Sequence, residues 1–339
     1  MDVHTNIPLK NYTTMRLGGS ARFMTDVHTP EEVAQACKNA IGQELPIFIL
    51  GGGSNIIVHD EGFNGIVIHN KIRGFEVISD EPGKTLVRIG AGENWDEAVK
   101  RTVDMNLSGI EALSAIPGTA GAAPVQNIGA YGQEIADSLV SLAAYDIQTD
   151  RFIELQNADC AFSYRHSIFR GEAAGRYVIL SITLQLYKTA PQPPFYAAVQ
   201  DYFDKNNITL YTPQAIRDAV RVIRADKLPD PAILPNAGSF FKNAIVEDWQ
   251  LTDLRQQYPD MPVYDMPDGR FKIPSGWLIQ EAGLKGQTLH GMHVHDKNAL
   301  VLINESASSY ADLAAAREEI IGAVRDKFRI TIEQEPLEV

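Results

Sequence analysis

One long alternating segment and several short apolar runs predict the strands of this chain. From Tyr177 to Tyr187 apolar residues occupy every second position, with Ile179 as the exception. A period of two predicts a β-strand with one more polar face. Shorter runs rich in branched apolar residues predict further strands at 46–50, 56–58, 65–69, 85–89 and 299–303.

Helices are predicted where a capping residue precedes an apolar stripe of period 3.6. Thr29, Pro30 and Glu32 together form a capping-box start for one helix. The apolar positions 216, 219, 220 and 223 define another, which two prolines after Lys227 bring to an end. One predicted helix begins at 30, and the others span 94–105, 212 to about 227, and 313–328.

The order of these elements bears on fold class. Helices and strands do not alternate regularly, which disfavours one doubly wound sheet and predicts an α+β chain of several subdomains. The length of 339 residues suits about two domains, or three small ones. Pro191, Pro193 and Pro194 cannot continue a central strand, so we expect a domain crossover there.

Charge and cysteine usage narrow the classes of function. The 45% apolar fraction excludes a disordered chain, and the net charge of −13 argues against a nucleic-acid or anionic-membrane partner. The chain has no apolar run of about 18 residues and starts without an apolar signal region. Cys37 and Cys160 lie far apart and outside a C-x-x-C spacing, which excludes a disulfide scaffold and a cysteine zinc site. We expect a cytoplasmic protein with reduced thiols.

A glycine-rich loop directly follows the predicted strand that ends at Leu50. Three adjacent glycines, Gly51 to Gly53, let the backbone approach a ligand and point N–H groups at phosphate oxygens. A tight turn between strands is the alternative interpretation. The loop is not a dinucleotide-binding G-x-G-x-x-G fingerprint, because Ile56 stands where the third glycine would be, and it lacks the G-K-[ST] of a P-loop.

A second loop, 116–132, has four glycines, four alanines and two prolines and almost no charge. Such a segment makes a poor helix or strand, and we expect its backbone to pack against a flat apolar body with a polar edge. A flavin ring and its pyrophosphate fit that description, with Asn127 and Tyr131 as polar contacts. A flexible loop is the alternative, although flexible loops favour Ser, Asp and Lys over Ala and Ile.

These loops and the motifs after them resemble one enzyme family. LGGGSN at 50–55, GAGENW at 90–95 and IPGTAGAAPVQNIGAYG at 116–132 are similar to the FAD-binding domain of the UDP-N-acetylenolpyruvoylglucosamine reductases (MurB type, longer subtype). The similarity continues in order through FSYRHSIF at 162–169, KLPDP at 227–231, NAGSFFKN at 236–243, SGWLIQ at 275–280 and NALVLIN at 298–304. It covers nearly the whole chain; the second loop and NAGSFFKN are its most specific parts.

The resemblance implies an α+β fold in which a two-subdomain FAD-binding part of the PCMH, or vanillyl-alcohol-oxidase-like, type carries a smaller α+β substrate-binding domain. The domains it implies are a first FAD-binding subdomain over 1–72, completed by the tail 330–339, a second over 73–227, and a UDP-sugar domain over 228–329.

The resemblance also implies a reaction. NADPH reduces FAD, and the reduced flavin converts the enolpyruvyl ether of UDP-N-acetylglucosamine-enolpyruvate to UDP-N-acetylmuramate, in bacterial peptidoglycan precursor synthesis. Because Ser54 and Asn55 follow the glycines, where covalent flavoproteins of this fold carry a histidine, the FAD is expected to be non-covalent. Another FAD-dependent oxidase or dehydrogenase of the same fold, or a nucleotide-binding module without catalysis, is the alternative.

Three residues match the family's catalytic positions. Arg165 would grip the substrate carboxylate with its planar fork, and Ser239 would donate the proton. Glu335 matches the C-terminal catalytic glutamate by spacing, with Glu338 as the alternative. From the residues alone, each has a simpler reading: a surface arginine, a turn serine after Gly238, and a frayed acidic terminus.

The remaining expected contacts also come from the resemblance. Cofactor contacts are expected at Gly51, Gly52, Gly53, Ser54, Asn55, Gly118, Gly121, Ala122, Ala123, Pro124, Asn127, Gly129, Ala130, Tyr131 and Ile179. Tyr196 resembles a substrate-closing tyrosine, while Lys227, Asn243 and Asn298 resemble positions that bind the UDP diphosphate or the nearby sugar. No metal is expected: the H-x-x-H-x-H pattern at 290–295 has no cysteine nearby and Asp296 as its only adjacent carboxylate.

Overall fold

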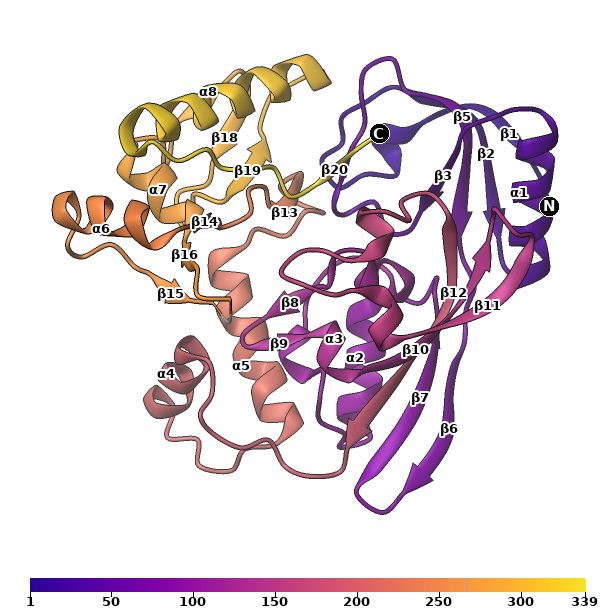
Figure 1. Cartoon of the computed structure of the whole chain (residues 1–339), viewed down its shortest axis with the longest axis horizontal. Helices are drawn as coiled ribbons and strands as arrows, with labels where there is room; N and C mark the ends of the chain where they lie inside the picture. Colours follow the sequence, from indigo (N-terminus) through magenta and orange to yellow (C-terminus); the bar gives the residue numbers. More distant parts are fainter. Residues whose placement is uncertain (267) are drawn as a thin grey trace. The chain divides into compact units, whose positions relative to one another are not determined.

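The computed structural model describes residues 1–266 and 268–339, and the chain forms two units. Unit 1 contains residues 1–7, 21–53 and 63–225, and unit 2 contains residues 8–20, 54–62 and 226–339. Figure 1 follows the chain through both. Each unit is therefore built from segments that are far apart in the sequence.

The first sheet of unit 1 is largely parallel and leads into the first glycine loop. In spatial order it contains β1 (His4–Pro8), β2 (Ser20–Val27), β5 (Phe63–Asn70) and β3 (Ile47–Leu50), with β2 and β3 parallel to β5. Helix α1 (Pro30–Gly42) connects β2 to β3. The Thr29 hydroxyl caps it by accepting from the Glu32 N–H at 3.2 Å. The Glu32 carboxylate accepts from His28 instead of Thr29, so the expected capping box is incomplete.

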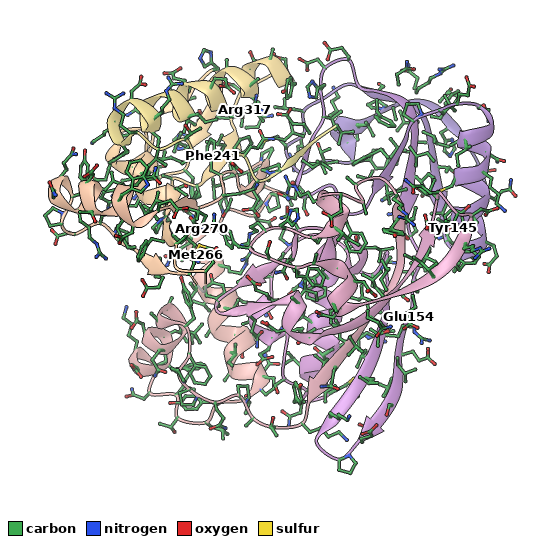
Figure 2. The ribbon with its side chains drawn as sticks, viewed as in Figure 1. Tyr145, Glu154, Phe241, Met266, Arg270 and Arg317 are labelled. Atoms are coloured by element: carbon green, nitrogen blue, oxygen red, sulfur yellow. The ribbon has the colours of Figure 1, made fainter. Side chains whose placement is uncertain are left out.

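The second sheet of unit 1 is antiparallel throughout. In spatial order it contains β11 (Arg151–Gln156), β10 (Leu139–Asp146), β12 (Tyr177–Tyr187), β7 (Lys84–Gly90) and β6 (Phe75–Glu81). The strand predicted at 177–187 is thus confirmed as the central one. Its Val178 side is buried, whereas Ser181 and Gln185 on the other side are partly exposed. Tyr145 on β10 and Glu154 on β11 mark two neighbouring strands in Figure 2.

Helix α2 (Trp95–Asp104) packs against this sheet. The Asn94 side chain caps it by accepting from the Glu97 N–H at 3.0 Å, as predicted. Trp95 and Val99 on its apolar face are buried in the same core as Ile182 and Leu184 of β12. The short helix α3 (Ile135–Ser138) directly precedes β10.

An ion pair at the end of β10 gives a pH-dependent contribution to stability. The Arg176 guanidinium donates to Asp146 at 3.1 and 2.8 Å, which lowers the pKa of this carboxyl to about 2. Since the unfolded chain titrates near ~3.9, the stabilisation is complete above that pH and is lost as the pH falls toward 2. We expect Asp146→Asn to lower the free energy of unfolding by about 1–2 kcal/mol at pH 7.

The difference between the wild type and Asp146→Asn should shrink between about pH 4 and pH 2 in urea-unfolding curves. Asp253→Asn, which changes an exposed carboxylate on α6, is the control. A difference that stays constant down to the acid end of this range would mean that the ion pair is not its cause.

Two helices follow the proline-rich segment and remain within unit 1 almost to their end. Helices α4 (Ala197–Lys205) and α5 (Pro213–Lys227) bury Val199, Phe203 and Val220 against Ala112. The crossover expected at 191–194 is therefore wrong: the chain passes from unit 1 to unit 2 at 225–226, and the side chains after the prolines belong to a unit 1 core. The start and the end predicted for α5 are confirmed.

Among its described residues, unit 2 has two small sheets, a strand pair and three α-helices. One sheet has the order β13 (Asn236–Ser239), β19 (Val301–Asn304), β18 (Met292–Val294), β17 (Thr288–Leu289), and the other β14 (Ala244–Val246), β16 (Phe271–Ile273), β15 (Tyr264–Asp265). The tail strand β20 (Leu337–Glu338) pairs in parallel with β4 (Ile56–Ile57). The helices are α6 (Asp248–Gln257), α7 (Ser275–Glu281) and α8 (Tyr310–Phe328).

The core of unit 2 forms where α8 lies along the β18–β19 sheet (Figure 1). Leu313, Ile320 and Val324 of α8 are buried there, which confirms the predicted final helix. The strand predicted at 299–303 begins later than expected, at Val301, because the Asn298 side chain accepts from the Leu300 N–H and forms a turn.

The two cysteines are free and buried. Burial raises the pKa of the Cys37 thiol to about 12 and that of Cys160 to about 11, so neither is a thiolate near neutral pH. None of the helices in the described part of the chain combines the length and apolar character that a membrane crossing requires.

Candidate active site

Two glycine-rich segments, 51–53 and 117–122, meet in unit 1 beside a third segment, 91–95. Gly118 O accepts from the Trp95 N–H at 3.1 Å, and the Gly121 N–H donates to Ala91 O at 2.8 Å. A Cβ at Gly52 would lie 2.8 Å from Gly118 Cα, and one at Gly121 would lie 2.6 Å from Ala91 Cβ. The two predicted cofactor loops are thus brought together, backbone against backbone, and the third segment is the GAGENW motif.

A cofactor that needs close backbone approach fits this cradle. Gly53 and Gly118 have φ values of +62° and +124°, which a side chain would strain, and glycine loops of this kind can point N–H groups at a phosphate. Ala122 is exposed beside Gly51, whereas Ala123 is buried in the core of unit 1. The FAD expected from the sequence therefore suits residues that the structure places side by side.

A substitution in the cradle should release the cofactor. In Gly52→Ala the new methyl group would overlap the Gly118 backbone, which cannot move aside as a side chain can. We expect FAD affinity to fall by about 10- to 100-fold, measured by titrating the apoprotein with FAD. Gly42→Ala, where nothing lies within 4 Å of the added group, is the control. Equal affinity in both variants would contradict the placement of the cofactor at this loop.

The second loop has more local structure than its composition predicts. It contains a 3-10 helix, η3 (Ala120–Gln126), followed by a two-strand hairpin, β8 (Gly129–Ala130) and β9 (Gln133–Glu134). Pro124 is buried inside η3. The prediction of a loop without helix or strand is therefore wrong, because packing against neighbouring backbone compensates for weak local propensity.

Asn127 stabilises this loop through hydrogen bonds of its buried side chain. Its side chain is fully buried, donates to Glu134 and to Ser163 O at 2.7 and 3.2 Å, and accepts from the Ala136 N–H at 3.2 Å. Both amide hydrogens are thus used by the protein. The side chain therefore supports the loop's own structure, and the contact of Asn127 with the cofactor stays a prediction.

Arg165 lies against the hairpin of the second loop. It has a left-handed φ of +53° in a tight turn closed by mutual backbone hydrogen bonds between Ser163 and His166. Its Nη2 donates to Gly129 O at 2.9 Å, and its guanidinium lies 5.3 Å from the centre of the Tyr164 ring. The Ser167 hydroxyl donates to Val125 O at 2.5 Å and anchors the same segment. The structure thus brings this predicted catalytic residue to the expected cofactor loop.

Further charged groups of this region were missed in the sequence. Arg224 on α5 donates to Ala115 O at 3.2 Å, and burial lowers the pKa of its guanidinium. Arg217, one heptad earlier, is 4% exposed and pairs with Asp96 of α2 at 2.6 Å. Residues 217, 220, 221 and 224 have the spacing of one helix face, adjacent to the apolar stripe. The spacing of Arg217 and Arg224, next to buried positions of the same helix, is the feature of the sequence that could have indicated these charged groups.

A pocket of about 400 Å³ in unit 1 lies beside Tyr131 and Tyr196. The two rings meet edge to face at 5.6 Å, and the proline segment 189–194 forms one wall. Burial raises the pKa of the Tyr131 hydroxyl and, at another part of the lining, the pKa of the Glu111 carboxyl. Tyr196, expected at the substrate, is thus adjacent to a residue expected at the cofactor.

Ser239 and Glu335 are brought close together in unit 2. Gly238, with a φ of +69° and its N–H on Asn236 Oδ1 at 2.8 Å, turns the chain just before Ser239. On the next residue, Phe240 O accepts from the Glu335 N–H at 2.8 Å. Glu335 is 8% exposed, so it is not a frayed terminal residue. The tail therefore runs beside the segment that carries the expected proton donor, with an isolated bridge between Phe241 and Gln334.

Glu338, the alternative to Glu335, is engaged elsewhere. Its carboxylate accepts from the Arg317 guanidinium on α8, which Figure 2 labels, and lies 3.5 Å from His59 Nε2. Partial burial acts to raise the pKa of Glu338, but the charge of Arg317 outweighs it and the net shift is downward. The ion pair between Glu338 and Arg317 therefore holds β20 in place. Because the Glu338 carboxylate is engaged there, Glu335 is the favoured catalytic candidate.

Two expected substrate contacts lie near the start of α7 in unit 2. Asn243 Oδ1 accepts from the Ser275 N–H at 3.2 Å, and Asn298 Oδ1 lies 3.6 Å from the position that a Cβ on Gly276 would take. Lys227 is the last residue of α5, and the neighbouring Asp226 pairs with Lys297 at 2.6 Å. These residues could donate hydrogen bonds to a phosphate through the amide nitrogens of Asn243 and Asn298 and the ammonium group of Lys227.

The other expected cofactor residues are divided between the units. Gly51 to Gly53, Gly129, Ala130 and Ile179 belong to unit 1, and Ser54 and Asn55 belong to unit 2. Ile179 O accepts from the Asn70 side chain at 2.8 Å, which links β12 to the end of β5.

The histidine-rich segment has protein partners in the structure. His293 lies 3.2 Å from Asp296 and 3.1 Å from the Thr288 hydroxyl, and His290 lies 3.1 Å from Glu319. Burial lowers the pKa of His295. Within residues 1–266 and 268–339, no three His, Cys, Asp or Glu side chains are grouped as metal ligands.

Comparison with known proteins assigns both parts of the chain. Residues 22–155 match an FAD binding domain, and residues 230–339 match the UDP-N-acetylenolpyruvoylglucosamine reductase, C-terminal domain. The chain is 41% identical to the UDP-N-acetylenolpyruvoylglucosamine reductase of Ralstonia nicotianae, over 97% of each chain. It is 40% identical to the enzyme of that name from Neisseria gonorrhoeae, over 97% of this chain and 95% of that protein.

Solved structures show the same fold. The UDP-N-acetylenolpyruvylglucosamine reductase of Thermus caldophilus aligns over 100% of this chain and 99% of its own, with a TM-score of 0.69 and 23% identity. The 6-hydroxy-D-nicotine oxidase of Arthrobacter nicotinovorans aligns over 97% of this chain and 83% of its own, with a TM-score of 0.51 and 12% identity. The predicted α+β fold of the FAD-binding PCMH type is therefore confirmed.

Proposed function

Because the chain belongs to the UDP-N-acetylenolpyruvoylglucosamine reductase family of FAD-containing oxidoreductases, we propose that it carries out the NADPH-dependent reduction of UDP-N-acetylglucosamine-enolpyruvate to UDP-N-acetylmuramate, a step of peptidoglycan precursor synthesis. The observation that carries the proposal is the backbone contact between the Gly51–Gly53 loop and the Gly118–Gly121 loop. That cradle suits a flat, phosphate-bearing cofactor, and the family supplies the reaction.

When bound, FAD would supply the redox chemistry, which is the transfer of a hydride from NADPH to the enolpyruvyl double bond. The residues that would hold it are the glycines of both loops, with Ala122, Ala123, Pro124, Ala130 and Tyr131. We assign non-covalent binding, because Ser54 and Asn55 follow the glycines and offer no ring nitrogen for a covalent link.

The residues of the chain manage the charge that the substrate acquires. Negative charge develops on the carbon next to the substrate carboxylate and spreads into that carboxylate. Arg165 stabilises it, because its fork matches a carboxylate and its backbone is held by the Ser163–His166 turn. Ser239 donates the proton to that carbon, and Glu335, buried beside Phe240, assists the charge stabilisation.

The remaining residues bind the nucleotide-sugar. Lys227 and the Asn243 and Asn298 amides carry donors for the diphosphate and the sugar, and Tyr196 closes over the substrate. A cytoplasmic location follows from where such precursors are made. We keep the domain boundaries of 1–72 with 330–339, 73–227 and 228–329 as part of the proposal.

The absorption spectrum of the purified protein separates this proposal from its alternatives. We expect flavin bands at about one FAD per chain, rapid bleaching by NADPH without oxygen, and return of the bands on adding the enolpyruvyl UDP-sugar. A protein that fails to bind added FAD would exclude all flavoenzyme proposals. Bleaching by another alcohol or amine, with no response to the enolpyruvyl sugar, would favour the oxidase or dehydrogenase alternative.

A further inference from the structure

An ion pair between the buried Arg217 and the partly exposed Asp96 joins α2 and α5 beside the second glycine loop. Arg217 donates to Asp96 through two nitrogens, at 2.6 and 3.0 Å, and to the Ser114 hydroxyl at 2.8 Å. Arg217 is 4% exposed. An ion pair with a buried member loses hydration on folding and often contributes little net stability, so its presence calls for another role.

The same carboxylate holds a strained backbone residue. Ala115 has a φ of +57°, a left-handed conformation that is unfavourable for alanine. Its N–H donates to Asp96 Oδ1 at 2.5 Å, and its carbonyl accepts from Arg224 Nε at 3.2 Å. Both backbone polar groups of Ala115 are therefore bound to charged side chains of this network.

Ala115 sets the direction of the chain as it enters the cofactor cradle. Three residues later, Gly118 lies against Gly52 with no room for a Cβ, and its carbonyl accepts from the N–H of Trp95, the neighbour of Asp96. An error of a few tenths of an ångström at Ala115 would alter this contact. The Asp96 carboxylate therefore holds the loop at Ala115. Its neighbour Trp95, at the start of α2, holds the same loop at Gly118.

We propose that Asp96 is a positioning residue that holds Ala115 in the left-handed conformation and thereby aligns the 116–121 loop with the 51–53 loop for FAD. The inference rests on the proposed function, since it assumes that these loops bind FAD. Arg217 orients the Asp96 carboxylate from one side, and Arg224 holds the other end of Ala115.

Glycine at position 115 provides the decisive comparison, because it adopts a positive φ without strain. We expect Asp96→Ala to weaken FAD binding to the apoprotein by about 10- to 100-fold, measured by the quenching of flavin fluorescence. Ala115→Gly alone should stay within about threefold of the wild type, because relief of strain offsets the entropy that glycine loses on folding. The double variant should regain most of the lost affinity.

The thermal midpoint of the apoprotein distinguishes positioning from general destabilisation. It should fall in Asp96→Ala, which leaves Arg217 buried without its carboxylate partner, and remain low in the double variant even though FAD affinity recovers. Asp104→Ala, which removes the exposed partner of Lys100 on the same helix, should leave FAD affinity unchanged.

Two results would overturn the inference: wild-type affinity in Asp96→Ala, or a double variant that binds FAD as weakly as Asp96→Ala. If Asp96→Ala does not fold, the same comparison is made with Asp96→Leu, which keeps a side chain of similar size but accepts no hydrogen bond from Ala115, and the same rescue by Ala115→Gly is required. A wild-type protein that does not bind FAD would instead refute the proposed function, which separates the two failures.

Discussion

Ser239→Ala should slow the reoxidation of the reduced enzyme by the enolpyruvyl UDP-sugar on the order of 10²–10⁴-fold, the usual contribution of a general acid. Reduction of the bound flavin by NADPH should remain near normal, since that half-reaction needs no proton from Ser239. Alanine also fits the backbone at this position, where Gly238 takes the left-handed φ of +69°. Stopped-flow absorbance without oxygen measures the two halves separately.

A matched control keeps this prediction specific. Ser306→Ala changes an exposed serine of unit 2 and should leave both half-reactions unchanged. Equal loss of both halves in Ser239→Ala would show that Ser239 acts in folding or cofactor binding. Unchanged reoxidation would remove it from the list of catalytic residues and leave Glu335 as the acid to be tested.

The second large effect is expected from Arg165→Lys. Lysine keeps the positive charge but loses the planar fork that now reaches Gly129 O at 2.9 Å, so it cannot grip a carboxylate with two parallel bonds. We expect kcat to fall by roughly 10²–10³-fold while KM for the UDP-sugar changes much less, because the arginine acts on charge that develops during the reaction. Steady-state kinetics with NADPH in excess measure both constants.

Arg170→Lys tests whether the segment or the guanidinium of Arg165 is responsible. Arg170 lies five residues further along and donates to the Gln126 side chain at 2.5 Å, so it anchors the same segment to η3. This variant should retain most of its turnover. A parallel loss in both variants would point to the segment's fold, and full turnover in Arg165→Lys would exclude Arg165 from catalysis.

Local signals explain what the sequence predicted well. The strand at Tyr177–Tyr187 and the caps Thr29 and Asn94 depend on the residues nearest in sequence, and the structure confirms them. Arg165, Ser239 and Glu335 followed from motifs of the family, and the structure places Arg165 at the second loop and Ser239 near Glu335.

Contacts between distant segments explain what the sequence did not predict. The units combine segments such as 8–20 and 226–339, which no local pattern connects, so the proline segment was mistaken for a boundary. The hydrogen bonds of Asn127 to Glu134 and Ser163 were not predicted either, because these partners lie seven and 36 positions away along the chain. The Asp96–Arg217 pair joins residues 121 positions apart, and neither partner alone signals it.

The most direct test of the central claim is a single anaerobic turnover. The protein with FAD bound is reduced by one equivalent of NADPH, and the enolpyruvyl UDP-sugar is then titrated in while the flavin bands and the mass of the sugar product are recorded. The account predicts that one equivalent of sugar restores the oxidised spectrum and gains two hydrogens as UDP-N-acetylmuramate. A flavin that stays reduced, with the sugar recovered unchanged, would contradict it.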